Sequence, residues 1–293
     1  IRLSLVGSEM CIRDSYKSVG LFADNSISWA VIDLACMQAE ICCIPVPPFF
    51  SPNQIEHLRI ATGMQALIGD PEQISEYDID KHLNSFEGIP DIAIHDLLKT
   101  GMAGDEKSEI SDSPGNVAKI TFTSGSTGTP KGVCLSRTCI ENTVRALDQR
   151  VPVGTSKRHL SVLPLVTLLE NIAGLYLSLV QGAQIMLYPM TKIGFNNLAS
   201  LDEKQFIYML NKCDPESLIL VPELLRLLVY AVGKKLVVAE KFKFIAVGGG
   251  VVSEKLLGQA RALGLPVLQG YGLSECASVV SLNSLNSNRS GLS

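Results

Sequence analysis

Short apolar runs alternate with helical patterns along most of this chain, and this alternation limits the fold more than any other feature. Residues 41–46, 66–68 and 117–123 have the length and hydrophobicity of buried strands. Residues 26–39 have helical spacing and an apolar face. Because strands that alternate with helices usually pair in parallel, we predict an α/β fold of layered, mostly parallel sheets.

Local start signals support two further helices. After Ser51, Pro52 suits the first helical position and Gln54 completes a capping box. Another helix is expected from Ser136. These signals place helices between the expected strands, as the layered fold requires.

A strand–helix–strand unit is predicted near the end of the sequence. A strand over residues 242–247 runs into three glycines, Ser253 caps a helix, and a second strand over 266–269 leads into residues 270–275. Both polar loops, and the loop after residues 117–123, therefore follow the carboxyl end of a strand. Open α/β sheets bind ligands at that edge, so we expect the three loops to converge on one site.

Composition excludes several classes of function. A formal net charge of -4 gives no global attraction for nucleic acid. The eight cysteines lack the spacing of a metal site or a disulfide framework and favour reduced core residues in a cytoplasmic protein. The sequence contains no uninterrupted apolar run of about 18 residues, the length that would indicate a membrane span. Residues 172–188, the nearest to one, read as a buried helix followed by a strand.

The first loop has the composition of a phosphate site. Glycines let its backbone amides approach an anion, hydroxyl groups add donors, and Lys131 adds a positive charge. A flexible Ser/Gly linker is the alternative, but this segment lies between a strand and a helix. Pro130 and Gly132 flank the lysine, which disfavours the Walker P-loop.

Two of these loops resemble signatures of the adenylate-forming (AMP-binding) superfamily, which includes acyl-CoA synthetases and peptide-synthetase adenylation domains. The first is Thr123-Ser124-Gly125-Ser126-Thr127-Gly128-Thr129-Pro130-Lys131-Gly132. The second is Tyr271-Gly272-Leu273-Ser274-Glu275, and Gly248-Gly249-Gly250 lies between the two. The resemblance runs from about Tyr16 to the end and is closest to long-chain fatty acyl-CoA synthetases. It implies layered parallel-sheet subdomains of the large N-terminal domain of such enzymes, in incomplete form.

The resemblance also implies a reaction and a site. A carboxylic acid, here a fatty acid, attacks ATP to give an acyl-adenylate, and coenzyme A then displaces AMP. Lys131 and Glu275 would be catalytic, and Thr123 and Glu275 would bind Mg²⁺. The residues from Ser124 to Lys131 would hold the phosphates, Tyr271 would stack on adenine, and Ser274 would reach the α-phosphate. The remaining cofactor-binding residues would be Gly248, Gly249, Gly250, Gln269, Gly270 and Gly272.

Two departures from the family pattern stand out. Residues 163–171 resemble the substrate-side segment, but Val166 and Thr167 replace an aromatic residue and a histidine, which puts a gating role in doubt. The alternative for residues 163–180 is a plain core helix. Glu40 stands where relatives have glycine, so a left-handed turn there would cost stability.

The expected organisation has an AMP-binding domain in two portions, residues 16–115 and 116–293. Residues 1–15 resemble a non-native leader, and the family's C-terminal domain is absent. A non-catalytic nucleotide-binding module and an amino-acid-activating domain remain alternatives. Peripheral membrane contact is left open, and the acyl chain length and oligomeric state are not indicated.

The resemblance implies a small C-terminal domain with a lysine that promotes adenylation. Because that lysine cannot be assigned in this sequence, we expect this polypeptide to show little or no ligase activity. The measurement is ATP–pyrophosphate exchange with a panel of fatty acids, using a full-length relative as the positive control. Turnover comparable to that relative would contradict the expectation.

Overall fold

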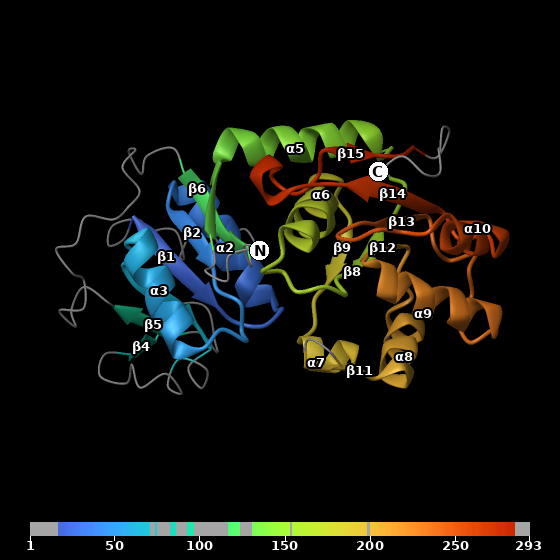
Figure 1. Cartoon of the computed structure of the whole chain (residues 1–293), viewed down its shortest axis with the longest axis horizontal. Helices are drawn as coiled ribbons and strands as arrows, with labels where there is room; N and C mark the ends of the chain where they lie inside the picture. Colours follow the sequence, from blue (N-terminus) through green and yellow to red (C-terminus); the bar gives the residue numbers. More distant parts are fainter. Residues whose placement is uncertain are drawn as a thin grey trace. The chain divides into compact units, whose positions relative to one another are not determined.

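The computed structural model of the chain describes residues 17–70, 74, 83–85, 93–96, 117–123, 131–152, 154–197 and 200–284. The chain divides into two compact units, Ile1–Thr138 and Cys139–Ser293, each with its own large sheet (Figure 1). This division falls beyond the boundary expected near residue 115, because β6 (Val117–Thr123) pairs with β2 (Cys42–Pro45) of the first sheet. The expected leader, residues 1–15, lies outside the described residues.

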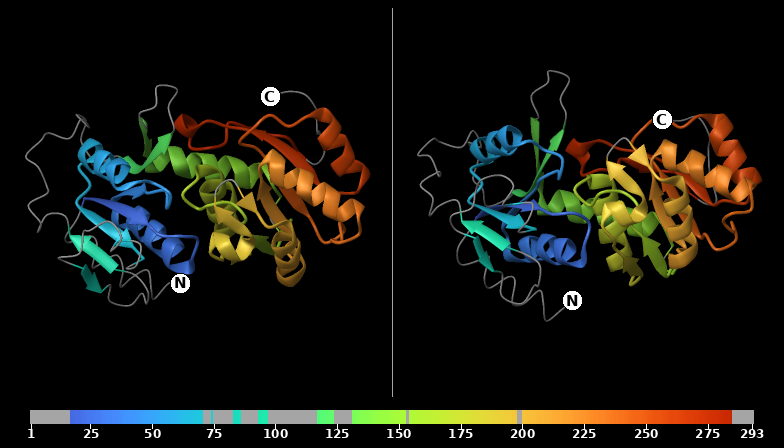
Figure 2. Two further views of the ribbon diagram at one scale, coloured as in Figure 1. Left: turned by 60° about the horizontal axis from the view of Figure 1, so that its bottom comes forward. Right: turned by 90° about the horizontal axis from the view of Figure 1, so that it is seen from below.

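The sheet of the first unit is mostly parallel at its centre and antiparallel at its edges. In spatial order its strands are β4 (Leu83–Ser85), β5 (Ala93–Asp96), β3 (Ala66–Gly69), β1 (Ser18–Phe22), β2, β6 and β7 (Lys131–Ser136). Strands β3, β1, β2 and β6 run parallel, whereas β5 and β7 join their neighbours antiparallel. Helices α2 (Ile27–Ala39) and α3 (Pro52–Thr62) cover opposite faces (Figure 2). This arrangement confirms the predicted α/β layers.

The helix boundaries follow the local signals in the sequence. Ser51 and Gln54 form the expected capping box at the start of α3. Helix α2 begins after Ser26, whose side chain accepts a hydrogen bond from the Trp29 amide. It ends at Glu40, which adopts the left-handed conformation at φ 59°. A glutamate therefore occupies a backbone position that favours glycine.

Helix α2 buries more of its surface than a single apolar stripe. Its Asp33 carboxylate lies 2.7 Å from the Lys119 ammonium of β6, and both side chains are fully buried. The Lys119 ammonium also lies 5.9 Å from the centre of the Trp29 ring. Pairing compensates each charge for the loss of water, so a charged residue is tolerated in an otherwise apolar interface.

The second unit is built on a sheet with one antiparallel edge strand. In spatial order its strands are β15 (Ser281–Leu282), β14 (Val267–Tyr271), β13 (Phe244–Val247), β12 (Ser217–Leu220), β8 (Arg158–Leu160) and β9 (Gln184–Met186). Strands β14 to β9 are parallel, and β15 joins β14 antiparallel. A small hairpin of β10 (Phe195–Asn197) and β11 (Ser200–Leu201) stands apart from this sheet.

Helices cover both faces of the second sheet (Figure 1). Helix α9 (Pro222–Gly233) packs against α8 (Glu203–Cys213) and α10 (Glu254–Ala262). The π-helix η3 (Leu169–Tyr176) and α6 (Leu177–Val180) lie on the other face. They connect β8 to β9, in the direction opposite to the connections from β12 to β13 and from β13 to β14. Because all these crossovers are right-handed, the two directions place helices on opposite faces. The remaining helices are α5 (Arg137–Arg150) and the short α7 (Met190–Ile193). The predicted helix and strand within residues 172–188 are thereby confirmed.

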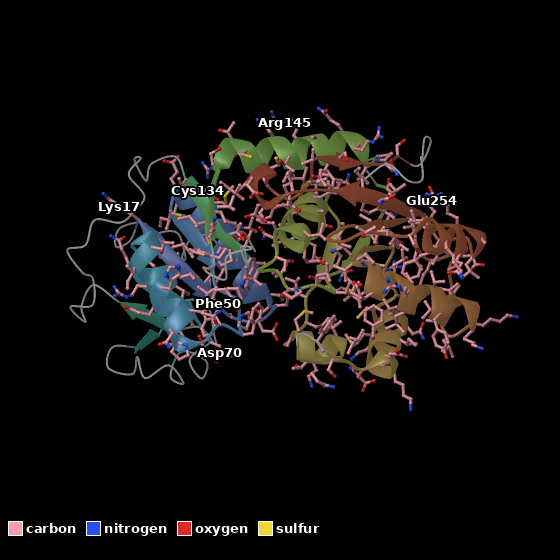
Figure 3. The ribbon with its side chains drawn as sticks, in the orientation of Figure 1. Lys17, Phe50, Asp70, Cys134, Arg145 and Glu254 are labelled. Carbon is pink, nitrogen blue, oxygen red and sulfur yellow. The ribbon has the colours of Figure 1, made fainter. Side chains whose placement is uncertain are left out.

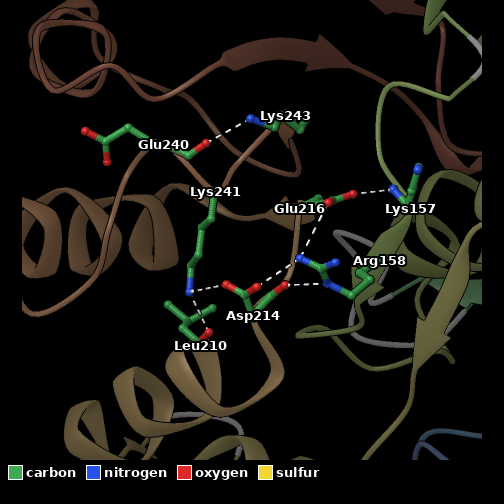
Figure 4. A network of polar contacts seen from close by, with 8 residues as sticks. All are labelled: Lys157, Arg158, Leu210, Asp214, Glu216, Glu240, Lys241 and Lys243. Carbon is green, nitrogen blue, oxygen red and sulfur yellow. Dashed lines mark hydrogen bonds and ion pairs between the residues drawn. The ribbon is translucent and has the colours of Figure 1, made fainter.

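Charged side chains tie together the amino-terminal ends of three strands in this sheet (Figure 4). Arg158 lies 2.9 Å from Asp214 and 3.4 Å from Glu216, which precede β12. Lys241, just before β13, donates to the Leu210 carbonyl at 2.6 Å. Partial burial lowers the pKa of Lys241. This network lies at the edge opposite to the polar loops, so it supports the sheet rather than the candidate site.

Most of the described cysteines are core residues, as predicted. Cys36, Cys42, Cys43 and Cys213 are buried, and all seven described cysteines are free. Cys134, labelled in Figure 3, and Cys276 are exposed instead. None of the described helices combines the length and apolarity needed to cross a membrane.

Replacing Glu40 with glycine is expected to stabilise the first unit. Glycine adopts the left-handed conformation without the steric cost to Cβ, which is about 1 kcal/mol. The exposed Glu40–Arg137 contact at 3.6 Å contributes little to oppose this gain. The measurement is the free energy of unfolding in urea. Gly63→Ala, at another left-handed helix end with φ 63°, is the reverse control and should destabilise. A loss of stability in Glu40→Gly would contradict this account.

Thiol labelling is expected to separate the cysteines by burial. Burial raises the pKa of Cys42 to about 12, so at about pH 8 this thiol stays protonated and unreactive. Iodoacetamide should modify Cys276 first, Cys134 more slowly because burial raises its pKa too, and Cys42 and Cys43 only after unfolding in guanidinium. Peptide mass spectrometry gives the rates. Rapid labelling of Cys43 in the folded chain would contradict its burial in the core of the first unit.

Candidate functional site

Two of the predicted loops meet at one edge of the second sheet. Strands β12, β13 and β14 are parallel neighbours, so their carboxyl ends point the same way. The glycines after β13 and the loop after β14 therefore lie side by side, where open α/β sheets bind ligands. This juxtaposition confirms that two of the three loops lie at the same sheet edge.

The glycine loop brings backbone, rather than side chains, to this edge. The Gly248 amide donates to the Leu220 carbonyl at 3.0 Å, which extends the β12–β13 pairing by one residue. A Cβ atom added at Gly248 would stand 3.5 Å from the Gly270 carbonyl oxygen. Gly249 has φ 75°, a conformation that favours glycine. The two loops thus approach within van der Waals distance, and the glycines add no side chains of their own to the space above them.

The loop after β14 turns back on itself and needs glycine to do so. A Cβ atom on Gly272 would stand 1.5 Å from the Ser278 carbonyl oxygen, a distance that no side chain allows. The Ser278 amide donates to Leu273 at 3.0 Å, and the Val280 amide donates to Tyr271 at 2.9 Å. These bonds hold the turn η4 (Ser274–Cys276) at the strand end. Tyr271 and Glu275 are exposed there, and Ser274 is half-buried.

Gln269 adds an unpaired acceptor close to the loops. This residue lies in β14, between β13 and the edge strand β15, its side chain is buried, and its Oε1 atom accepts no hydrogen bond from any described residue. The backbone carbonyl of Gln269 is used by the Asn283 amide at 3.0 Å, so only the side chain is left over. A polar atom without a partner next to two glycine-rich loops suits a polar ligand.

The first unit carries the other expected phosphate residues. Thr123 ends β6 and pairs with Lys131 at the start of β7, so the two residues face each other across an antiparallel hairpin. Strand β7 was not expected from the sequence. Ser124, Gly125, Ser126, Thr127, Gly128, Thr129 and Pro130 lie outside the described residues. Their assignment to phosphate binding stays a prediction.

The expected magnesium ligands come from separate units. Thr123 belongs to the first unit and Glu275 to the second. Among the described residues, no group of three or more His, Cys, Asp and Glu side chains is arranged to hold a metal ion. A hydroxyl and one carboxylate would suit Mg²⁺ only together with phosphate oxygens and water. The joint role of these two residues stays a prediction.

The predicted helix within residues 172–188 reaches this edge, but its contacts there were not foreseen from the sequence. The π-helix η3 places Leu169 beside the glycine loop, 3.5 Å from the position of a Cβ atom on Gly249. The next residue, Glu170, is fully buried and bonded to His159. A glutamate inside the apolar run of residues 168–177 was a visible signal, because an unpaired charge is rarely buried.

Comparison with known proteins finds relatives of this chain at low sequence identity. A mitochondrial medium-chain acyl-CoA ligase of Rattus norvegicus is 27% identical over 206 residues, covering 58% of this chain and 33% of that protein. Bacitracin synthase 3 of Bacillus licheniformis is 24% identical over 244 residues, covering 82% of this chain and 3% of that protein. The chain therefore spans a third or less of the length of these relatives.

Solved structures share the fold at low identity. A long-chain-fatty-acid-CoA ligase of Archaeoglobus fulgidus superimposes with a TM-score of 0.70 and 18% identity, covering 97% of this chain and 58% of that one. The family model described as AMP-binding enzyme matches residues 14–292, nearly the whole chain. Fold, loop signatures and family model agree, so this chain belongs to the AMP-binding enzyme family.

Proposed function

We propose that this chain binds magnesium ATP and contributes the nucleotide side of a ligase that joins a carboxylic acid to coenzyme A through an acyl-adenylate. The observation that carries the proposal is the meeting of the glycine loop and the loop after β14 at one sheet edge. Backbone at Gly248 and Gly270 approaches closely there, and Tyr271 and Glu275 are exposed beside it. Such an edge accommodates a flat base and leaves a carboxylate free for a metal-bound phosphate.

Within this proposal, each residue has the role that suits the charge, hydroxyl group or ring of its side chain. Lys131 and the preceding loop hold the β- and γ-phosphates, and Thr123 and Glu275 hold Mg²⁺. Tyr271 stacks on adenine, and Ser274 reaches the α-phosphate. Each neutralises or positions negative charge that would otherwise keep the acid carboxylate away from ATP. The cytoplasmic location suggested by the reduced cysteines belongs to the same proposal.

A fatty acid is the substrate class we favour. The segment that approaches the glycine loop is apolar, and Leu165, Leu168 and Ile172 are buried in it. An amino acid would bring an ammonium group that needs a free carboxylate nearby. Glu170 is the carboxylate of η3, but it is buried and already bonded to His159 at 2.8 Å. The relationship to bacitracin synthase 3 keeps amino-acid activation as the second candidate.

Binding of ATP tests the nucleotide assignment without requiring turnover. We expect Lys131→Ala to weaken the affinity for magnesium ATP about tenfold, which corresponds to about 1.4 kcal/mol. Glu275→Ala should remove most of the dependence on Mg²⁺. Lys204→Ala, at an exposed lysine of α8, is the matched control and should bind as the unaltered chain does. Isothermal titration calorimetry with and without Mg²⁺ measures both effects.

A second readout uses Cys276, the exposed neighbour of Glu275. Magnesium ATP should slow the alkylation of Cys276. Alkylation of the exposed Cys134 is the control, because a slower rate there as well would indicate a general effect of ATP on the reagent. Adenosine sulfamates that carry a fatty acyl or an aminoacyl group should then distinguish the two substrate classes. If the chain ignores ATP in the presence and absence of Mg²⁺, the proposal is wrong.

A further inference from the structure

A chain of buried hydrogen bonds runs through the second unit to η3. Ser156 Oγ donates to Ser217 Oγ at 2.9 Å, and Ser217 Oγ lies 3.1 Å from His159 Nδ1. His159 Nε2 lies 2.8 Å from Glu170 Oε1. All four side chains are at most 8% exposed. The chain therefore connects β8, β12 and η3 inside the core.

The Glu170 carboxylate, which can only accept hydrogen bonds, fixes the direction of this chain. Because Ser156 donates to Ser217, the Ser217 hydroxyl proton is free to point at Nδ1 of His159, which accepts it. The ring proton then lies on Nε2 and is donated to the Glu170 carboxylate. The opposite neutral tautomer would set a nitrogen lone pair against a carboxylate oxygen, so Glu170 selects the tautomer that donates from Nε2, and Ser217 donates to Nδ1.

Gly174 provides the space that this bond needs. A Cβ atom at position 174 would stand 2.2 Å from Glu170 Oε1 and 2.9 Å from His159 Nε2. Residues four apart share one face of a helix, so the glutamate side chain lies where a side chain at 174 would otherwise lie. Any residue other than glycine would push the carboxylate away from the imidazole.

The arrangement is costly for a purely structural contact. The second carboxylate oxygen, Glu170 Oε2, is buried and has no hydrogen-bond partner among the described residues. An apolar side chain would fill the same space without burying an unsatisfied oxygen. The glutamate also lies in a π-helix, a rare geometry that occurs mostly at functional sites.

The residue before Glu170 links this chain to the sheet edge. The Leu169 side chain lies 3.8 Å from the position of a Cβ atom on Gly248 and 3.5 Å from that on Gly249. The orientation of the first turn of η3 therefore decides how closely Leu169 covers the glycine loop. Glu170 carries the charge of that turn, and its bond to His159 anchors the turn to β8.

We propose that His159 and Glu170 are positioning residues that lock η3, hold Leu169 over Gly248 and Gly249, and so decide which acyl group fits beside the nucleotide. This inference rests on the proposed function, because it concerns the acyl side of the same site. It assigns selectivity to a hydrogen bond within the core rather than to a residue that touches the acid.

Two helical glycines give a matched test. Alanine is a better helix former than glycine, so Gly→Ala within a helix normally raises the melting temperature. At Gly258 of α10 an added Cβ would meet no heavy atom within 4 Å, and Gly258→Ala should behave in this normal way. We expect Gly174→Ala to do the opposite and lower the melting temperature, because it separates Glu170 from His159.

The decisive readout is selectivity among adenosine acyl sulfamates of increasing chain length. Gly174→Ala should change the ratio of affinities between the longest and the shortest analogue by about tenfold, the scale that a hydrophobic pocket gives to one or a few methylene groups. Its affinity for magnesium ATP should stay within about twofold of the unaltered chain, a difference below 0.5 kcal/mol. Gly258→Ala should leave both quantities unchanged.

A second pair of variants guards against failure of Gly174→Ala to fold. Glu170→Gln keeps a carbonyl acceptor for His159 and should retain the selectivity ratio, whereas Glu170→Ala should lose it. Two results would show that the positioning role is wrong while the proposed function stands. Glu170→Ala could lower the affinities for ATP and for every analogue equally, or it could have the same ratio of affinities between the longest and the shortest analogue as Gly258→Ala. If the unaltered chain binds neither ATP nor any analogue, the proposed function fails and this inference fails with it.

Discussion

Parallel pairing of β12, β13 and β14 is the constraint on which the candidate site depends. The register pairs Leu220 with Val247 and Val247 with Gln269, so β12 and β13 end together and β14 continues two residues further, to Tyr271. All side chains of β12 and β13 are buried, and the polar loops begin directly after these strands. Glycine and a tight turn follow there, so the edge presents backbone together with the exposed side chains of Tyr271 and Glu275.

The two edges of this sheet are specialised in different ways. At the amino-terminal edge, Arg158, Asp214 and Glu216 form ion pairs that hold strand starts together. At the carboxyl edge, Gly249 and Gly272 remove side chains and let loops approach each other. The ion pairs thus lie at the edge away from the candidate site, where loops rather than charged pairs occupy the strand ends.

The buried chain from Ser156 to Glu170 connects these edges. It begins before β8, passes through the centre of the sheet at His159 and Ser217, and ends on a helix that covers the glycine loop. A hydrogen-bonded core network has few alternative arrangements, because each member that loses its partner is left unsatisfied. Such a network is suited to holding one element in one position.

Several elements could be predicted because their signals are local. The capping box at Ser51, the strand before Gly248 and the loop before Glu275 each depend on residues close in sequence. Strand β7 was missed because Lys131–Ser136 has little apolar alternation and is paired only through β6. The compact units divide after Thr138 rather than near residue 115, since β6 joins the first sheet through its pairing with β2.

The sequence by itself determined the α/β class, the left-handed turn at Glu40 and the family, because short-range patterns and loop signatures specify them. The tertiary structure alone decided that His159, Ser217 and Glu170 share one set of hydrogen bonds. These residues are separated by up to 58 positions along the chain, and only strand register brings their side chains together. A glutamate in an apolar run signals that a partner exists, but its identity is a property of the folded core.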